Sequence, residues 1–268
     1  MAAGAAVKEN AMSRYVDVEQ AKSMPGLRLV LSRGTPGPWG EAAKNIFDLK
    51  GIQYARVSQM PGLPNEELKA WTGRNNAPIA IYNDEAPVDS WFGILNLAER
   101  LNPEPKLIPQ HEAQRADMFG LCHEVCGEDG LTWNRRLQMV AAWDQFGTEA
   151  DAPMRTKMKT QYGGSDAALK QASSRVIAIL RHFTIVIQQQ KQNGSHYLVG
   201  NQLSAADIHF STALATLAPL PEEKCPMDKG IRAIYQTMEP EVAAVFDPIL
   251  LKFRDYQYEH HLSLPLDL

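Results

Sequence analysis

The sequence is poor in cysteine and has neither a long hydrophobic run nor a basic cluster. Its three cysteines, Cys122, Cys126 and Cys225, are too few for a disulfide framework and favour free thiols in a reducing cytoplasm. No stretch approaches the roughly 18 uninterrupted apolar residues of a membrane span. The formal charge is only −4 and no basic stripe is present, which argues against nucleic acid as a partner. Residues 1–10 lack the basic and apolar segments of a secretory signal.

Several catalytic signatures are absent as well. The chain contains no phosphate loop, no zinc-protease motif and no nucleophile elbow. Cys122, His123 and Cys126 lie close in sequence, but no fourth zinc ligand is suggested nearby, so we interpret the cysteines as buried thiols and expect no metal site. What the chain does have is 268 residues with 44% hydrophobic content, enough for one large domain or two modest ones.

Residues 26–102 show alternating strand and helix patterns after an arm, residues 1–25, that we expect to be loosely held. Breaker residues separate the segments, and Gly51 ends the first long helix. Asn65 is typical of a residue that caps a short helix. The order is strand, helix, strand, helix, two short strands in a hairpin, and helix, which is the plan of a thioredoxin-like domain. The predicted strands are 27–32, 53–58, 79–82 and 86–88, and the long helices are 39–50 and 91–101.

The remainder of the chain is predicted to be helical. Prolines in residues 103–109 indicate a linker, and residues 110–268 then form an all-helical domain. The segment 148–165 is either a mobile loop or carries a helical turn. Periodic apolar residues predict helices near 110–126, 132–147, 166–192, 204–217, 228–237 and 240–257.

The Ala77-Pro78 pair opens a short apolar strand, and its peptide bond has two readings. An X-Pro bond has only a small trans preference, so a cis bond is accessible and would turn the main chain of Ala77 outward. An ordinary trans proline at the start of an edge strand is the alternative. With the flanking pattern of strand, turn and acid-serine pair, we favour cis.

The acid-serine pair is Asp89-Ser90, at the start of the helix 91–101. Free amides and the helix dipole there favour an anion. Ser90 could donate to a carboxylate while Asp89 pairs with an ammonium group, so that one helix end recognises both charges of an α-amino acid. The alternative is a plain helix cap, the commonest use of Asp and Ser.

The order of a small thioredoxin-like domain and a helical domain resembles the glutathione transferase superfamily over roughly residues 27–258. Three motifs carry the resemblance: the first helix 39–51 with its glycine stop, Ala77-Pro78 with Asp89-Ser90, and the segment 197–208. In the last motif, Ser204-Ala205-Ala206-Asp207 is a capping-box variant that starts a buried helix. The resemblance implies glutathione as a cosubstrate on the first domain. It would be bound by Trp39, Ala77, Pro78, Asp89 and Ser90.

The position that would stabilise the glutathione thiolate has no side chain. In many relatives a Ser or Cys stands 14 residues before the glycine that corresponds to Gly51, and that position here is Gly37. The nearest hydroxyls are those of Thr35 and, less favourably placed, Ser32, and Tyr15 lies on the arm. Main-chain amides of Trp39 and Gly40 at a helix N-terminus are the alternative. The missing cysteine argues against disulfide exchange.

The resemblance also implies a second substrate between the domains. Its wall would come from Met118, Phe119, Cys122 and Trp133 on the first long helices of the second domain, and the segment 256–268 could close the top. An apolar cleft suits an apolar electrophilic small molecule.

Two functions remain open. The first is a cytoplasmic glutathione transferase-like enzyme that presents the thiolate to an apolar electrophile. The second is a non-catalytic binding or assembly module of the same fold, suggested by Gly37. Both imply a homodimer, by analogy with the family alone.

Overall fold

A computed structural model describes residues 15–149, 152–162 and 164–268 of the chain. The first domain is built on three strands, β1 (Leu27–Ser32), β2 (Tyr54–Gln59) and β3 (Ile79–Tyr82). They form one sheet in the order β2-β1-β3. The central strand, β1, pairs in parallel with β2, with Val30 opposite Val57, and antiparallel with β3, with Val30 opposite Ile79. Both faces of β1 are covered, which fits its almost continuous apolar run.

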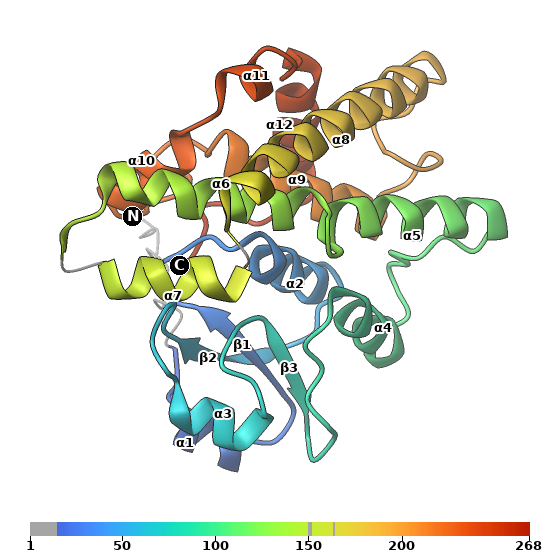
Figure 1. Ribbon diagram of the computed structural model, residues 1–268. Helices are drawn as coiled ribbons and strands as arrows, with labels where there is room; N and C mark the ends of the chain where they lie inside the picture. The colour runs from blue at the N-terminus through green and yellow to red at the C-terminus, as the bar shows by residue number, and fades with distance from the viewer. Residues whose placement is uncertain (1–14, 150–151, 163) are drawn as a thin grey trace, which may run out of the picture.

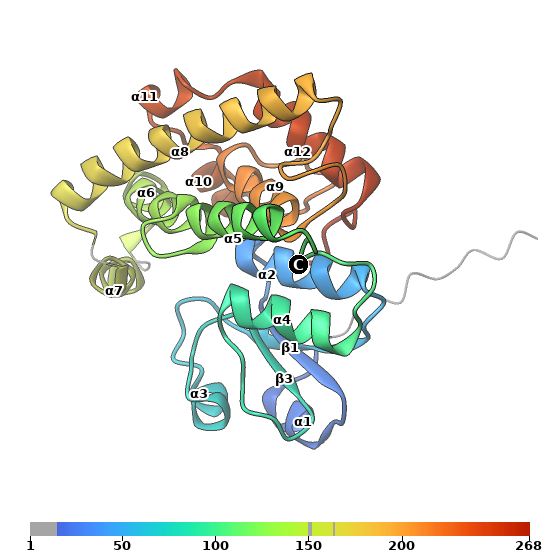
Figure 2. The ribbon, with the colours of Figure 1, turned by 90° about the vertical axis from the view of Figure 1, so that its right-hand side faces the viewer.

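Two pairs of helices cover the two faces of this sheet. One face packs Val30, Val57 and Ile79 against Val18 and Leu68, which belong to α1 (Val18–Ser23) and α3 (Glu66–Thr72). The other face packs against α2 (Pro38–Leu49) and α4 (Trp91–Leu101). Figures 1 and 2 show α2 and α4 between the sheet and the helical domain, with α1 and α3 on the far side. The start of α2 is therefore positioned at the junction of the two domains.

The second domain is organised around one buried helix, α9 (Ala205–Leu217). All its residues except Ala215 are buried, and it packs against α2, α5 and α12. Residues of α2 and α9 share one hydrophobic core, so the two domains are joined by continuous apolar packing. The remaining helices are α5 (Glu112–Cys126), α6 (Leu131–Phe146), α7 (Ala152–Tyr162), α8 (Asp166–Gln192), α10 (Lys229–Gln236), α11 (Pro240–Ala243) and α12 (Pro248–His260).

The capping box predicted at the start of α9 is confirmed. The carboxylate of Asp207 accepts from the main-chain N–H of Ser204 at 2.8 Å and of Leu198 at 2.7 Å. Burial raises the pKa of Asp207 to about 6. The cysteines are free and buried, as the sequence predicted. Among the described residues, no helix has the length and apolar character needed to cross a membrane.

Four local predictions need correction. The described part of the arm, residues 15–25, is not loose: Val16 bridges to Val57 and α1 packs on the sheet, while residues 1–14 lie outside the described residues. Asn65 does not cap α3 with its side chain; it adopts φ 50° and its amide holds the main chain of Met60 instead.

The third correction concerns the helix predicted over 240–257. It is divided into α11 and α12, with Pro248 in the first turn of the latter. The second strand of the predicted hairpin, 86–88, is reduced to one bridge, between Ala80 and Val88. The open segment 148–165 carries α7.

Candidate active site between the domains

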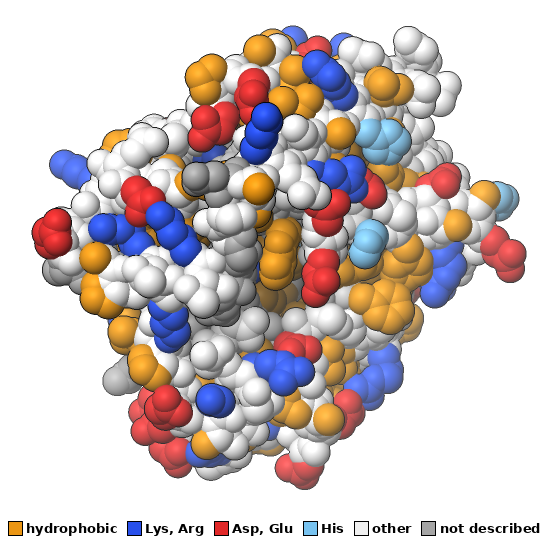
Figure 3. All heavy atoms as spheres, viewed as in Figure 1, with side chains coloured by type: hydrophobic (Ala, Val, Ile, Leu, Met, Phe, Trp, Pro, Cys, Tyr) orange, Lys and Arg blue, Asp and Glu red, His pale blue; other side chains and the backbone are white. Residues whose placement is uncertain are grey.

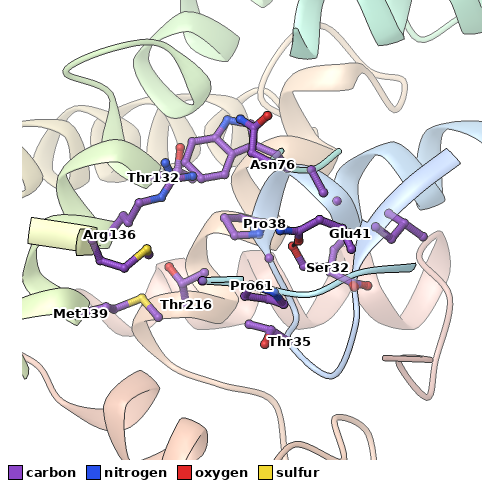
Figure 4. Close-up of a pocket in the computed structure, with 18 of the residues that line it drawn as sticks. Ser32, Thr35, Pro38, Glu41, Pro61, Asn76, Thr132, Arg136, Met139 and Thr216 are labelled. Atoms are coloured by element: carbon purple, nitrogen blue, oxygen red, sulfur yellow. Dashed lines mark hydrogen bonds between the residues drawn. The ribbon is translucent and has the colours of Figure 1, made fainter. Parts of the chain in front are cut away.

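A cavity of about 220 Å³ lies where the two domains meet. The first domain lines it mainly with the end of β1, the loop to α2 and the first turn of α2, and the second domain lines it with residues of α6, α7, α9 and α10. Figure 4 shows Ser32, Thr35 and Pro38 on one side, with Arg136 and Met139 opposite. Of the residues singled out from the sequence, it brings together Tyr15, Ser32, Thr35, Gly37, Trp39, Gly40 and Ala77.

The peptide bond between Ala77 and Pro78 is cis, as predicted. The pairing of β3 with β1 ends at Ile79, so Ala77 lies beyond the hydrogen-bonded ladder. It is half-buried and lines the cavity together with Asn75 and Asn76. The main-chain groups of residues 75–77 therefore lie at the cavity and are not part of the hydrogen-bonded ladder between β1 and β3.

Ser90 and Asp89 have separate partners. Ser90 is the N-cap of α4, and its hydroxyl oxygen accepts from the main-chain N–H of Gly93 at 3.0 Å. The Asp89 carboxylate accepts from Nε of Arg74 at 2.6 Å, and its side chain is 37% exposed. Neither residue lines the cavity itself. Sequence reasoning missed Arg74, which has no periodic or motif signal and comes close only through the loop before β3.

The N-terminus of α2 points an uncapped turn at the cavity. Gly37 is the N-cap residue, so no side chain accepts from the first amides. Pro38 occupies the first helical position and has no N–H, which leaves the amides of Trp39 and Gly40 as the first donors. The helix dipole adds partial positive charge at this end. This arrangement favours a bound anion.

Three hydroxyls from the N-terminal part of the chain line the cavity near this helix end. Ser32 is committed to another side chain, because its Oγ donates to Oε1 of Gln59 at 2.9 Å. Thr35 lines the cavity, and its main-chain carbonyl accepts from Gly37 at 2.8 Å. Tyr15 also lines the cavity, and burial raises its pKa to about 12, so it stays protonated at neutral pH. Thr35 and Tyr15 are thus the hydroxyl donors available to an anion here.

Trp39 spans the two domains. Its indole Nε1 donates to the carbonyl of Cys126 at 3.1 Å. The guanidinium of Arg136, on α6, lies 4.3 Å from the centre of the indole ring. Such a distance is well within cation–π range, so the ring and the charge position each other.

A buried arginine of α6 connects the helices on the second-domain side of the cavity. Arg135 donates to the carbonyls of Thr216 at 3.0 Å, Tyr235 at 3.0 Å and Thr237 at 2.7 Å. Burial lowers its pKa to about 10, so it remains charged at neutral pH. In turn Tyr235 donates its hydroxyl to the carbonyl of Pro36 at 3.2 Å. The loop that carries Thr35 is therefore connected to α6 through Tyr235.

A second cavity of about 500 Å³ adjoins the first and shares Thr35, Arg136, Met139 and Tyr235 with it. Figure 3 shows a hollow between the two domains, with hydrophobic side chains at its back. The lining is mainly apolar and comes from α6, α7 and α10. Its apolar members are Pro61, Met139, Val140, Trp143, Phe146, Met158, Ile231 and Ile234.

Four residues were predicted from the sequence to form the wall of a second-substrate site: Met118, Phe119, Cys122 and Trp133. Met118 and Cys122 are completely buried and in contact, Sγ to Sδ 3.5 Å, because that face of α5 packs on α9. Burial raises the pKa of the Cys122 thiol well above its usual value. Phe119 packs against Phe92, and Trp133 lies beside Arg136. None of the four lines either cavity.

A different helical stripe lines the second cavity. Arg136, Met139, Val140 and Trp143 recur at spacings of three and four on α6, and all of them line the second cavity. The segment 256–268 was predicted to close the top of the second-substrate site. Its first residues belong to α12, and near its end Lys44 of α2 donates to the carbonyl of Asp267 at 2.7 Å. None of its residues lines either cavity.

Comparisons with known proteins agree with this architecture. The family model described as glutathione S-transferase, C-terminal domain, matches residues 153–243. A glutathione S-transferase from Methylobacterium radiotolerans, in complex with glutathione sulfonate, is 16% identical, with TM-score 0.58 over 87% of this chain and 91% of that one. A glutathione S-transferase domain-containing protein from Marinobacter aquaeolei is 13% identical, with TM-score 0.59 over 87% and 98%.

Beta-etherase LigF from Sphingobium sp. strain SYK-6 is 19% identical, with TM-score 0.57 over 82% of this chain and 98% of that one. No curated protein matches the sequence. The chain thus has the glutathione transferase fold, a thioredoxin-like domain followed by a helical domain, and the predicted resemblance to that superfamily is confirmed.

Proposed function

We propose that this protein binds glutathione at the junction of its domains and presents the thiolate to an electrophile in the adjoining apolar cavity. One observation carries the proposal: the N-terminus of α2, Thr35 and the main chain of Ala77 meet in one cavity. The Methylobacterium radiotolerans protein of the same fold holds glutathione sulfonate, which is a glutathione analogue.

The amino-acid end of glutathione would lie toward α4. Ser90 and the amides at that helix end suit its carboxylate, and Asp89 suits its ammonium group. Arg74 already pairs with Asp89, so it would either share that carboxylate or turn toward the carboxylate of the ligand. The middle of the tripeptide would pair with the main chain of Ala77, beyond the end of the β3 ladder.

The thiolate would lie against the start of α2. The amides of Trp39 and Gly40 favour an anion over a neutral thiol, and the hydroxyl of Thr35 adds a donor from the adjacent loop. Because Thr35 lines both cavities, it lies where sulfur and electrophile would meet. In the reaction, the sulfur forms a bond to the electrophilic carbon and the leaving group departs with the electron pair.

The second substrate would occupy the larger cavity. We propose Met139, Val140 and Trp143 of α6, with Ile231 and Ile234 of α10, as the wall of its site, in place of the four residues predicted from the sequence. Apolar side chains with few polar groups are typical of sites that bind aromatic or aliphatic small molecules.

A second candidate function is glutathione binding without turnover. Gly37 favours it, because the N-cap position of α2 has no hydroxyl or thiol that could activate the sulfur. In that case the protein would bind the tripeptide but would not lower the pKa of its thiol.

The experiment that separates the two candidates is a pH titration of bound glutathione, followed by the ultraviolet absorbance of its thiolate. Turnover requires a thiol pKa below that of free glutathione in the wild-type protein. Thr35→Ala should move this pKa back upward, and Thr35→Ser, which keeps the hydroxyl, should not. An unshifted thiol pKa in the wild type favours the binding module. Tyr15→Phe tests the other hydroxyl in the same assay.

A further inference from the structure

Among the described residues, those that line the second cavity carry more positive than negative charge: Arg33, Arg136 and Asp228. Oδ1 of Asp228 accepts from the N–H groups of Gly230 at 2.7 Å and Ile231 at 3.2 Å, at the start of α10. Two arginines at an otherwise apolar cavity give an acidic group of an occupant a charge partner.

Arg136 is the charge best placed to contact an occupant, since it lines both cavities. Its guanidinium lies 4.3 Å from the ring centre of Trp39 and 5.7 Å from that of Trp133, both within cation–π range. These contacts hold the charge at the wall of the cavity. A guanidinium group binds a carboxylate through two parallel hydrogen bonds.

Two further cations, Arg135 and Lys157, line the first cavity. Arg135 is buried and donates to three main-chain carbonyls. Lys157 of α7 lines the first cavity and its Nζ lies 3.4 Å from the carbonyl of Gly62. The acid in the first cavity, Glu41, is paired with Lys44 at 2.9 Å. The lining of both cavities thus favours anions, and Arg136 is the cation that reaches the apolar one from α6.

We infer that the electrophile is an aromatic or similarly apolar molecule that carries a carboxylate or another acidic group, and that Arg136 binds this group. The apolar body lies against Met139, Val140 and Trp143. The inference rests on the proposed function and names its substrate class. The acidic group takes no part in bond making: sulfur bonds to carbon, the leaving group departs with its electron pair, and the carboxylate stays ionised.

The first test measures binding alone, with dinitrobenzoate and neutral dinitrobenzene as unreactive probes, added to the glutathione-bound protein in a calorimeter. We expect dinitrobenzoate to bind about tenfold more tightly, the effect of a charge-assisted hydrogen-bonded pair. Arg136→Gln should abolish the preference and Arg136→Lys should keep part of it. The matched control is Arg115→Gln, because Arg115 also lies over an aromatic ring, 5.0 Å from the centre of Phe119, but outside both cavities.

The second test measures turnover of a chlorodinitrobenzene and the corresponding chlorodinitrobenzoate, each corrected for its uncatalysed rate with free glutathione. Arg136→Gln should raise the KM for the benzoate about tenfold more than it raises the KM for the neutral substrate, whatever it does to the KM for glutathione. Equal affinity of the wild type for the two unreactive probes overturns the inference, as does an equal change in KM for the two substrates in Arg136→Gln. Absence of any glutathione binding is a different result, which overturns the proposed function itself.

Discussion

Tyr235 of α10 donates its hydroxyl to the main-chain carbonyl of Pro36, 3.2 Å away, and so connects the helical domain to the loop that precedes α2. The side chain is 4% exposed, so the hydrogen bond is shielded from water. Both residues flank the position where the thiolate would lie. The loop geometry therefore depends on a contact from the other domain.

Removing this hydroxyl should destabilise the protein and weaken the site. For Tyr235→Phe we expect a loss of about 1 kcal/mol in the free energy of unfolding, because the carbonyl of Pro36 loses a buried donor. The control is Tyr258→Phe: the Tyr258 hydroxyl is also buried but has no hydrogen-bond partner among the described residues, so its removal should cost nothing. Urea unfolding of both variants measures the difference, and equal losses would contradict the role assigned to Tyr235.

A hydroxyl can be added where the sequence lacks one. A Cβ at Gly37 would meet no atom within 4 Å, and its φ of −66° suits any residue. Serine is also a good N-cap, so Gly37→Ser should fold with unchanged or slightly higher stability. We expect it to lower the pKa of bound glutathione thiol further and to raise kcat/KM several-fold. Gly37→Ala adds the same Cβ without the hydroxyl; a similar gain in that variant would show that the hydroxyl is not responsible.

The carboxylate of Asp89 can be tested against a matched acid in the same domain. Asp89→Asn removes the charge proposed to pair with the ammonium group of glutathione, and should weaken glutathione binding about tenfold, as expected for a charge-assisted contact. Glu85 is likewise exposed and paired with an arginine, Arg100, so Glu85→Gln controls for the loss of a surface ion pair. Calorimetry compares the two; matching affinities would remove Asp89 from the site.

A buried histidine predicts how stability depends on pH. His209 of α9 is 3% exposed, its ring nitrogens have no partner among the described residues, and burial lowers its pKa to about 4. As pH falls below about 6.5 the unfolded chain takes up a proton that the folded protein does not accept until about pH 4, so stability is lost in that window. Asp207 has the opposite effect: because its pKa is raised to about 6, the folded protein takes up a proton before the unfolded chain does, and the free energy of unfolding rises as the pH falls below about 6.

The variant His209→Leu should remove this loss. Between about pH 7.5 and about pH 5, its free energy of unfolding should fall by about 2 kcal/mol less than that of the wild type, since Asp207 is common to both proteins. Urea unfolding at the two pH values makes the comparison. Parallel pH profiles for the two proteins would contradict a neutral, buried imidazole.

Much of the fold could be predicted because its signals are local. Gly51 ends α2 with φ 65°, and the capping box at Ser204 starts α9 as its residues predict. The cap predicted at Asn65 was wrong because the Asn65 side chain accepts from the main-chain N–H of Met60 instead. No helix signal in the sequence reveals this contact. Conversely, α1 was missed although Asp17 and Gln20 form a capping box, since the segment is short and the box lies in an otherwise polar arm.

The site divides in the same way. Thr35, Gly37 and Ala77, which line the first cavity, could be singled out from the sequence because each belongs to a loop next to a recognisable strand or helix end. The wall of the second cavity was not, because helical periodicity identifies a face but not its neighbour. The stripe of Met118 and Cys122 turned out to pack on α9, and an equally regular stripe on α6 lines the cavity.

The most direct test of the central claim is isothermal calorimetry of the intact protein with glutathione. The account predicts saturable binding of one tripeptide per chain at millimolar or lower concentration, and competition by glutathione sulfonate for the same site. No heat of association at millimolar glutathione, with the protein folded as judged by circular dichroism, would contradict it.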